Sequence, residues 1–330
     1  MMDHDLKDNF HFKPAPGLSN KHIQTLLPRF INRTSIQVIE EELPLPDGDF
    51  VDLAWVNPPQ SATDKPLVVV FHGLEGSLHS PYARDILHEI QQRRWHGVLM
   101  HFRGCSGRLN RLPRSYHSGE TGDARYLLQQ LTNRYPNLPL VAVGYSLGGN
   151  MLLKLQAEWG RESLLRAAVS VSAPLKLDIC SERIHQGFSR VYERHLVNSL
   201  VSKVLAKFED HDYEKLIGLT REGIRVVRSF REFDDRFTAP IHGFTDADDY
   251  YRQSSAHDYV GDIQQPALII QALDDPFMTP GVLPPAKNLP THIELAVSRF
   301  GGHVGFVEGS IFRPGYWLPR AALDYLAQFV

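Results

Sequence analysis

The stretch VAVGYSLGGNML, residues 141–152, places a serine between two glycines, directly after an apolar run and directly before an apolar helical pattern. The apolar run is typical of a strand that is buried on both faces. A strand that ends in G-x-S-x-G and opens a helix holds its serine in a sharp, strained turn, with the hydroxyl exposed above the sheet. Ser146 is therefore a candidate nucleophile.

The pentapeptide is weak evidence by itself, because glycine and serine are common residues. The alternative interpretation is a tight glycine-rich turn that contains a bystander serine. The flanking strand and helix favour the nucleophile. A helix that begins near Leu147 would aim its free N–H groups and the positive end of its dipole at the same place.

Outward from this junction, short apolar runs alternate with helical patterns along most of the chain. The runs that indicate strands lie at residues 36–43, 50–56, 67–73, 97–102, 140–144, 167–174, 267–273 and 293–297. The patterns that indicate helices lie at residues 81–93, 123–135, 150–160 and 318–329. Strands that alternate with helices of about 10–15 residues are typical of a parallel sheet with helices on both faces. We therefore expect an α/β fold with a mostly parallel eight-stranded sheet.

The domain organisation follows from where this alternation starts and stops. Residues 1–35 are expected to form an irregular N-terminal arm, and residues 36–330 one α/β domain. Residues 175–262 contain no strong strand pattern, which predicts a helical lid or cap inserted between the sixth and seventh strands. Such an insertion would lie over the carboxyl ends of the strands, where open α/β sheets hold ligands. An apolar helical stripe within residues 187–208 fits either ordinary packing or the wall of an acyl pocket.

A serine hydroxyl needs a base to accept its proton and an acid to orient that base. When the serine lies in a G-x-S-x-G turn between a strand and a helix, the acid follows it along the chain and the histidine comes last. Asp274 and Asp275 follow one late strand, and His303 follows the last strand. Adjacent side chains leave an extended chain on opposite sides, so at most one aspartate can meet His303. Asp275 is favoured because Pro276 biases it to an extended backbone, which leaves Asp274 as a cap or loop ligand.

Two N–H donors must also face the oxyanion that develops during attack by a serine. One is expected to be the backbone N–H of Leu147, the residue after the candidate nucleophile. The other is expected in the loop HGLEGS, residues 72–77, which follows a predicted strand. Leu74 is the candidate donor there, with Gly73 permitting a sharp backbone path. The alternative interpretation of this loop is an ordinary strand-to-helix turn.

The composition argues against several functional classes. A net charge of −3 over 330 residues leaves no basic surplus for a nucleic-acid backbone, so no nucleic-acid partner is expected. The two cysteines form neither a disulfide framework nor a C-x-x-C pair. No signal peptide and no apolar run of about 18 residues occur, so we expect no transmembrane anchor and a cytoplasmic location. No H-E-x-x-H motif occurs and the histidines are scattered, so no metal is expected.

The turn around Ser146 and the two loops that carry Asp275 and His303 belong to a longer series of short motifs. The series reads HGLEGS (72–77), HFRGCSG (101–107), YHSGETGD (116–123), GYSLGGN (144–150), FDDRFTAPIHGF (233–244), DDPFMTP (274–280) and GGHVGF (301–306). It resembles the α/β-hydrolase superfamily and, more narrowly, its YheT-type (AB hydrolase family 4-like) serine hydrolases. The arm segment GLSNKHIQTLLP (17–28) is similar as well. The resemblance implies carboxylic-ester hydrolysis without a metal or organic cofactor, with Ser146 as nucleophile, Asp275 as acid and His303 as base.

We therefore expect a serine carboxylesterase that acts through an acyl-serine intermediate. The expected partner is a small-molecule ester, either a short- to medium-chain acyl ester or a lipid-like acylglycerol. Two alternatives stay open. An acyltransferase would use the same three residues and pass the acyl group to an alcohol or thiol, and a non-catalytic protein would keep the scaffold for ligand binding. No oligomeric state is predicted.

Overall fold

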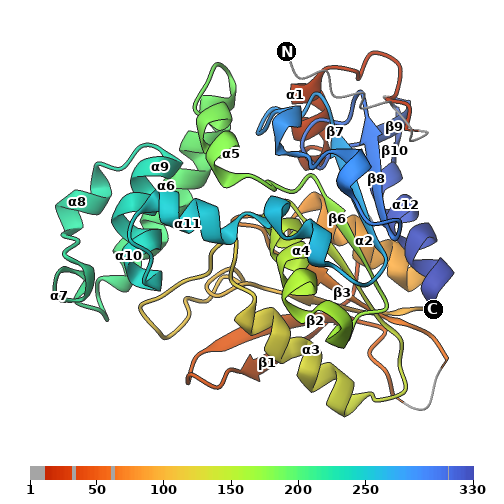
Figure 1. The fold of residues 1–330 in the computed structure, drawn as a ribbon, viewed down its shortest axis with the longest axis horizontal. Helices are drawn as coiled ribbons and strands as arrows, with labels where there is room; N and C mark the ends of the chain where they lie inside the picture. Colours follow the sequence, from red (N-terminus) through yellow and green to blue (C-terminus); the bar gives the residue numbers. More distant parts are fainter. Residues whose placement is uncertain (1–11, 32–34, 61–63, 311) are drawn as a thin grey trace.

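An eight-stranded sheet runs through the molecule, with helices on both of its faces (Figure 1). This computed structural model describes residues 12–31, 35–60, 64–310 and 312–330. The strand order is β1-β2-β4-β3-β5-β6-β7-β8, in which β2 pairs antiparallel with β1 and β4 and the other pairs are parallel. The bounds are β1 (Ile39–Pro44), β2 (Phe50–Val56), β3 (Leu67–Phe71), β4 (His96–Met100), β5 (Leu140–Tyr145), β6 (Ala167–Val171), β7 (Ala267–Ala272) and β8 (Ile293–Ser298). The predicted mostly parallel sheet is confirmed.

The central strands are apolar along their whole length because both of their faces are covered. Every residue of β3 and of β5 is buried. Along β3, Leu67 and Val69 belong to the core on one side of the sheet, whereas Val68 and Val70 belong to the core on the other side. This explains why the sequence shows continuous apolar runs here instead of alternation.

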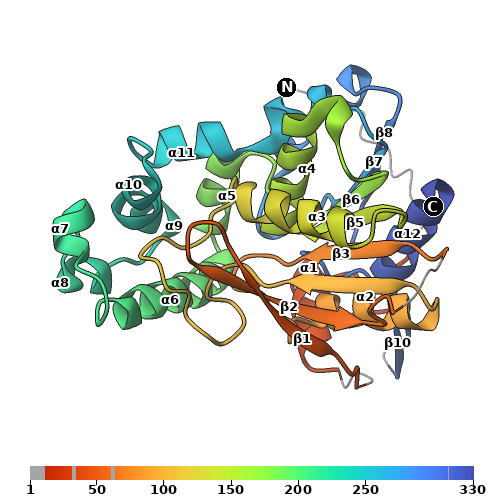
Figure 2. The same ribbon diagram turned by 90° about the horizontal axis from the view of Figure 1, so that it is seen from below.

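Two pairs of helices cover the two faces (Figure 2). One face carries α2 (Pro81–Gln92) and α12 (Trp317–Leu326), and the other carries α3 (Gly122–Arg134) and α4 (Leu147–Trp159). Helix α4 begins directly at the residue after Ser146, three residues before the helical pattern in the sequence. None of the described helices is both long enough and apolar enough to cross a bilayer.

Seven helices between β6 and β7 gather at one end of the sheet, with α6–α10 on the left in Figures 1 and 2. Their bounds are α5 (Leu177–Ile184), α6 (Ser189–Lys207), α7 (Tyr213–Ile217), α8 (Arg221–Arg225), α9 (Phe230–Phe233), α10 (Ala239–His242) and α11 (Ala247–Ser254). A π-helical turn, Asp234–Thr238, joins α9 to α10. Helix α6 packs on α8 and α9 in an apolar cluster that includes Val197, Val201 and Phe237. These helices therefore have a small core of their own.

The N-terminal arm was expected to be irregular, which is wrong for its described part. The segment contains helix α1 (Lys21–Leu26), whose six residues are too few to give a clear period in the sequence. Gln24 of α1 is fully buried and exchanges hydrogen bonds with the backbone of Val307. The arm is thus tied to the far end of the chain. Residues 1–11 and 32–34 of the predicted arm lie outside the described residues.

A two-stranded antiparallel hairpin near the C-terminus was not predicted. It consists of β9 (Val307–Ser310) and β10 (Arg313–Tyr316). Each strand has four residues, and Gly309, Pro314 and Gly315 lie in them. Glycine and proline are depleted in strands, so the sequence signal here is weak.

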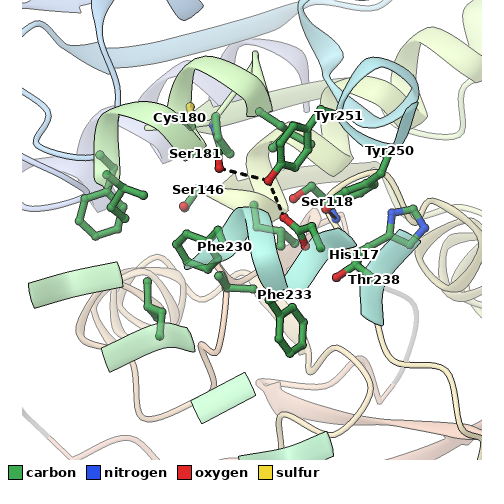
Figure 3. A pocket seen from close by; sticks show the side chains of 18 of the residues that line it. His117, Ser118, Ser146, Cys180, Ser181, Phe230, Phe233, Thr238, Tyr250 and Tyr251 are labelled. Atoms are coloured by element: carbon green, nitrogen blue, oxygen red, sulfur yellow. Dashed lines mark hydrogen bonds between the residues drawn. The ribbon is translucent and has the colours of Figure 1, made fainter. Parts of the chain in front are cut away.

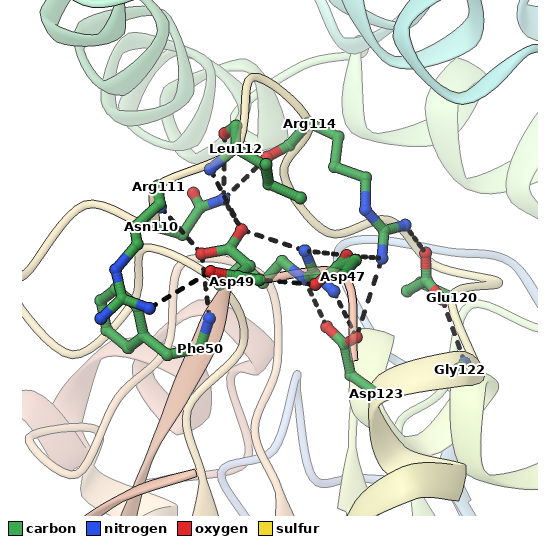
Figure 4. Close-up of polar contacts among 12 residues, drawn as sticks. Asp47, Asp49, Phe50, Asn110, Arg111, Leu112, Arg114, Glu120, Gly122 and Asp123 are labelled. Carbon is green, nitrogen blue, oxygen red and sulfur yellow. Dashed lines mark hydrogen bonds and ion pairs between the residues drawn. The ribbon is translucent and has the colours of Figure 1, made fainter. Parts of the chain in front are cut away.

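A buried ionic cluster joins the β1–β2 turn to the loop after β4 (Figure 4). Arg103, only 2% exposed, bonds to the Asp123 carboxylate at 2.7 and 2.6 Å and to Asp49 at 3.0 Å. Asn110 donates to Asp49 at 2.6 Å, and Lys207 of α6 donates to the side-chain oxygen of Asn110 at 2.8 Å. Buried charges are tolerated when they are paired and hydrogen-bonded in this way. The cluster therefore fixes this loop between the sheet and α6.

Candidate active site

Ser146 lies between β5 and α4 with φ 51° and ψ −120°. A non-glycine residue in such a conformation costs about 1–3 kcal/mol and persists only where its surroundings enforce it. A Cβ on Gly144 would lie 2.4 Å from the carbonyl oxygen of Gly148, and a Cβ on Gly148 would lie 2.5 Å from that of His72. The Ser146 N–H donates to the carbonyl of Val171 at 2.8 Å. The sharp turn therefore depends on the two glycines that flank the serine in the sequence.

Side chains from the ends of three strands form one chain of hydrogen bonds. The Ser146 Oγ lies 3.0 Å from His303 Nε2, and His303 Nδ1 lies 2.9 Å from Asp275 Oδ2. An ionised carboxylate can only accept a hydrogen bond, so it holds the proton on Nδ1 and leaves Nε2 to accept from the serine hydroxyl. His303 is 6% exposed and Asp275 is 3% exposed. The structure thus brings together the three residues that the sequence singled out.

The two adjacent aspartates have separate partners. Asp275 also accepts the backbone N–H of Phe277 at 2.8 Å, whereas Asp274 accepts the N–H of Gly302 at 2.9 Å. Burial raises the pKa of Asp274 to about 6, and the neighbouring charge of Asp275 acts in the same direction. Asp274 therefore braces the loop before His303, while Asp275 meets the imidazole.

Two further residues contact His303, one at its ring and one at its backbone, and were not singled out from the sequence. The ring of Phe277 stacks on the ring of His303 with centroids 4.0 Å apart and planes 12° apart. The backbone N–H of His303 donates to Thr25 Oγ1 of α1 at 2.9 Å. Two signals in the sequence could have pointed to them. Phe277 lies within the motif DDPFMTP, and the arm segment 17–28, which contains Thr25, resembles the same hydrolase family as the other motifs.

The loop HGLEGS lies beside the serine. A Cβ on Gly73 would lie 3.0 Å from the Cβ of Ser146, and Leu74 and Leu147 line the same cavity as Ser146. Within the part of the chain that the structure describes, the backbone N–H groups of Leu74 and Leu147 have no hydrogen-bond acceptor. Both groups are therefore available to a ligand.

Glu75 connects this loop to helix α6 and was also missed. Its backbone has φ 55°, and its N–H donates to the Tyr116 hydroxyl at 2.8 Å. Its carboxylate accepts from Lys203 Nζ at 2.8 Å and from the Ser199 hydroxyl, both on α6. The path of the loop around Leu74 therefore depends on the position of α6.

A cavity of about 120 Å³ lies beside Ser146, under the inserted helices (Figure 3). Leu196 and Leu200 of α6 line it, whereas Val197 and Val204 pack in the core of the insertion. The apolar stripe along α6 thus contributes both to the wall of this cavity and to the core of the insertion, and an acyl pocket stays a prediction.

One cluster resembles a metal site. His117, Glu120 and His242 bring ligand-type atoms within 4.8 Å of one another. Burial lowers the pKa of both histidines to about 3, so both imidazoles are neutral. However, Arg114 Nη1 donates to the Glu120 carboxylate at 2.7 Å, so a cation would compete with this ion pair. The absence of a metal cofactor stays a prediction.

Comparison with known proteins agrees with the fold. Residues 66–310 match the protein family described as alpha/beta hydrolase fold. The match covers more than half of the chain, so the chain belongs to the α/β-hydrolase family.

Among individual proteins, the chain is 47% identical to "Putative esterase YheT" of Escherichia coli (strain K12), over 99% of this chain and 96% of that protein. It is 30% identical to "Phospholipase ABHD3" of Mus musculus, over 93% of this chain and 76% of that protein. The solved structure of the alpha/beta hydrolase GrgF from Penicillium sp. sh18 has a TM-score of 0.58 at 16% identity, covering 89% and 99% of the two chains. At 16% identity, the similarity to this solved structure concerns the fold alone. The identity of 47% to the Escherichia coli protein confirms the expected YheT-type resemblance.

Proposed function

We propose that this chain is a serine carboxylesterase that hydrolyses short- to medium-chain acyl esters or acylglycerols. The observation that carries the proposal is the continuous chain of hydrogen bonds from Ser146 through His303 to Asp275, beside a largely apolar cavity. One relative is named an esterase and another a phospholipase, which supports ester substrates. A cytoplasmic location stays a prediction from the sequence.

The mechanism assigns one role to each side chain. Ser146 Oγ attacks the ester carbonyl while His303 Nε2 takes its proton, and His303 then returns the proton to the leaving alcohol. The acyl group remains on Ser146 until a water, deprotonated by His303, attacks it and releases the acid. Asp275 stays ionised and stabilises the imidazolium that forms in both steps.

The oxyanion of each tetrahedral intermediate is assigned to the backbone N–H groups of Leu74 and Leu147. Both are unpaired among the described residues and line the cavity with Ser146. Donors fixed before the reaction stabilise developing charge without reorganising, and one such donor contributes about 10²–10³-fold in turnover.

Helices α5–α11 are assigned the role of a lid over this site. Residues of α5, α6, α9 and α11 line the cavity together with Ser146. The cavity of about 120 Å³ is small for a long acyl chain. Pockets that hold drug-sized ligands measure about 300–1,000 Å³. We expect p-nitrophenyl butyrate and octanoate to give kcat/KM values at least about tenfold above that of the palmitate ester.

The proposal is tested with Ser146→Ala and a fluorophosphonate probe. The wild-type protein is expected to hydrolyse p-nitrophenyl butyrate and to be labelled by the probe, and Ser146→Ala is expected to lose at least about 10³-fold in turnover and all labelling. Ser202→Ala, an exposed serine on α6, is the matched control and keeps both. Near-normal hydrolysis by Ser146→Ala would reject Ser146 as the nucleophile.

The two alternatives give different outcomes in the same assay. An acyltransferase would pass most of the acyl group to an added alcohol, so the ratio of new ester to free acid separates it from a hydrolase. A non-catalytic binding protein would neither turn over esters nor react with the probe while folded.

A further inference from the structure

The side chains that line the cavity beside Ser146 fall into two sets of different chemistry, which we call the apolar wall and the polar wall. An apolar wall contains side chains such as Leu196, Leu200 and Met278. The other wall is rich in hydroxyl and carboxyl groups, which come from Ser118, Ser181, Asp234, Thr238 and Tyr251. Figure 3 shows Ser181 and Tyr251 turned toward each other on this wall. A uniformly apolar acyl pocket would not need these polar groups, because a buried polar group without a partner destabilises the fold.

The carboxyl of the polar wall belongs to Asp234, which lies on an uncommon backbone element. Asp234 opens the π-helical turn that joins α9 to α10, and single π-turns of this kind occur frequently at functional sites. The Tyr251 hydroxyl donates to Asp234 Oδ2 at 2.8 Å and lies 3.2 Å from Ser181 Oγ. Its neighbour Asp235 is exposed and is held by Arg231 and by a backbone N–H. Of the two adjacent acids, Asp234 alone lines the cavity.

The cavity leaves this carboxyl without a counter-ion. Among the described residues that line the cavity there is no lysine or arginine, and His117 is neutral because burial lowers its pKa to about 3. Burial raises the pKa of Asp234 to about 7. Arg231, whose charge acts on Asp234, is paired with Asp235 and Asp248, and its guanidinium lies 5.8 Å from the centre of the Tyr251 ring. A bound hydroxyl can donate to this carboxyl or accept from it, whereas a phosphate or carboxylate would be repelled.

We propose that Asp234, together with Tyr251 and Ser181, binds the free hydroxyls of an uncharged polyol leaving group and disfavours alcohol groups that carry a phosphate or carboxylate. This specificity subsite rests on the proposed esterase activity. The apolar wall then takes the acyl chain, and the polar wall takes the alcohol. A glycerol monoester fits this division, since its unreacted hydroxyls can make further hydrogen bonds to the Asp234–Tyr251–Ser181 network, which a simple alkyl ester cannot do.

The test compares four butyrate esters that share one acyl group: glycerol monobutyrate, n-propyl butyrate, butyryl glycerol phosphate and butyrylcholine. Release of butyric acid gives kcat/KM for each ester. In an assay at about pH 8.5, where Asp234 with its pKa of about 7 is ionised, the wild-type protein is expected to prefer the glycerol ester over the propyl ester by at least about tenfold, the value of one good hydrogen bond to a charged group. The phosphorylated ester is expected to be the poorest of the four.

Asp234→Asn and Tyr251→Phe are expected to lower the glycerol-to-propyl ratio to within about threefold of unity. Asp234→Asn is also expected to raise the relative rate on the phosphorylated ester. The ratio within one variant cancels a general loss of folded enzyme. Asp235→Asn, next in the chain but outside the cavity, is the matched control and keeps the wild-type ratio.

Several results would overturn the subsite. Unchanged ratios in both variants would do so, as would an equal loss on the glycerol and propyl esters. A wild-type preference for butyrylcholine that disappears in Asp234→Asn would assign the carboxyl to a cation instead. If no ester is hydrolysed and the fluorophosphonate probe leaves Ser146 unlabelled, the esterase itself has failed. If p-nitrophenyl butyrate is hydrolysed but the glycerol-to-propyl ratio of kcat/KM is the same in the wild type and in both variants, only the subsite is rejected and the esterase stands.

Discussion

At the scale of single residues, Asp274 and Asp275 show how neighbouring carboxyls acquire different roles. They share a chemical type and a strand end, but one faces the His303 ring and the other faces a backbone N–H. The chain turns after β7, with the Asp275 N–H donating to the Ala272 carbonyl at 3.3 Å, and the two side chains leave this turn toward different partners. The difference between them is therefore geometric, and substitution can separate the two roles.

We predict that Asp275→Asn lowers kcat about 10⁴-fold, because an amide facing Nδ1 favours the wrong tautomer of His303. Asp274→Asn, the matched variant one residue away, keeps an oxygen for the Gly302 N–H and is expected to retain kcat within about tenfold. Steady-state kinetics with p-nitrophenyl butyrate measure both. A larger loss in Asp274→Asn than in Asp275→Asn would exchange their assignments.

Asp274 also predicts a pH dependence of stability. Its pKa of about 6 in the folded chain lies above the value of about 3.9 expected in the unfolded chain. The folded state therefore holds the proton more tightly, and this contribution to stability is present below about pH 4 and lost as the pH rises through 6. Relative to Asp274→Asn, the wild-type free energy of unfolding should fall by about 1 kcal/mol between pH 4.5 and 7.5, a value discounted for partial solvent exposure. Urea denaturation at the two pH values measures the change, and a constant difference would contradict it.

At the scale of elements, helix α1 holds the loop that carries His303. Thr25 accepts the His303 N–H, and Gln24 bonds to Val307 a few residues further on. A Cβ on Gly305 would lie 2.1 Å from the carbonyl oxygen of Gln24, so the loop runs in close contact with the helix. The arm is therefore part of the support of the active site.

We predict that Thr25→Val lowers kcat about tenfold with little change in KM, because the imidazole moves while the substrate cavity does not. Thr25→Ser keeps the hydroxyl and is expected to restore the wild-type kcat. Separate determination of kcat and KM for the two variants provides the test. Equal losses in Val and Ser variants would show that the hydroxyl is not the relevant group.

At the scale of the whole molecule, polar contacts along α6 hold the insertion and the sheet together. Lys203 reaches Glu75 in the loop beside Ser146, and Lys207 reaches Asn110 in the buried ionic cluster. Lys207 also donates to the carbonyl oxygens of Leu112 and Arg114. The position of α6 therefore sets both the cavity wall and the path of the loop.

We predict that Lys207→Met destabilises the chain by about 2 kcal/mol, because Asn110 Oδ1 loses its donor and the carbonyls of Leu112 and Arg114 keep only the donor from Asn110. Lys215→Met, at an exposed position on α7, is the matched control and should change stability by less than about 0.5 kcal/mol. Urea denaturation measures both variants. A Lys207→Met protein as stable as the control would contradict the assigned role of this lysine.

The sequence predicted what depends on local pattern and chain order. The elbow around Ser146 and the sheet follow from apolar runs and glycines, and Asp275 and His303 follow from their places after late strands. The sequence could not predict contacts between distant segments, such as Thr25 with His303 or Lys203 with Glu75. Each of these joins polar residues that look like ordinary surface positions until the fold brings them together.

The crowding around Gly144 and Gly148 has a consequence for how this chain can change over generations. Even a methyl group at either place would collide with a main-chain carbonyl, which cannot swing aside as a side chain can. The cavity beside Ser146, in contrast, is lined by side chains such as Leu196, Leu200 and Met278, which differ in shape from one residue type to another. Substitutions that accumulate in such a protein should therefore change the side chains of the cavity, and with them the substrate preference, while both glycines stay unchanged.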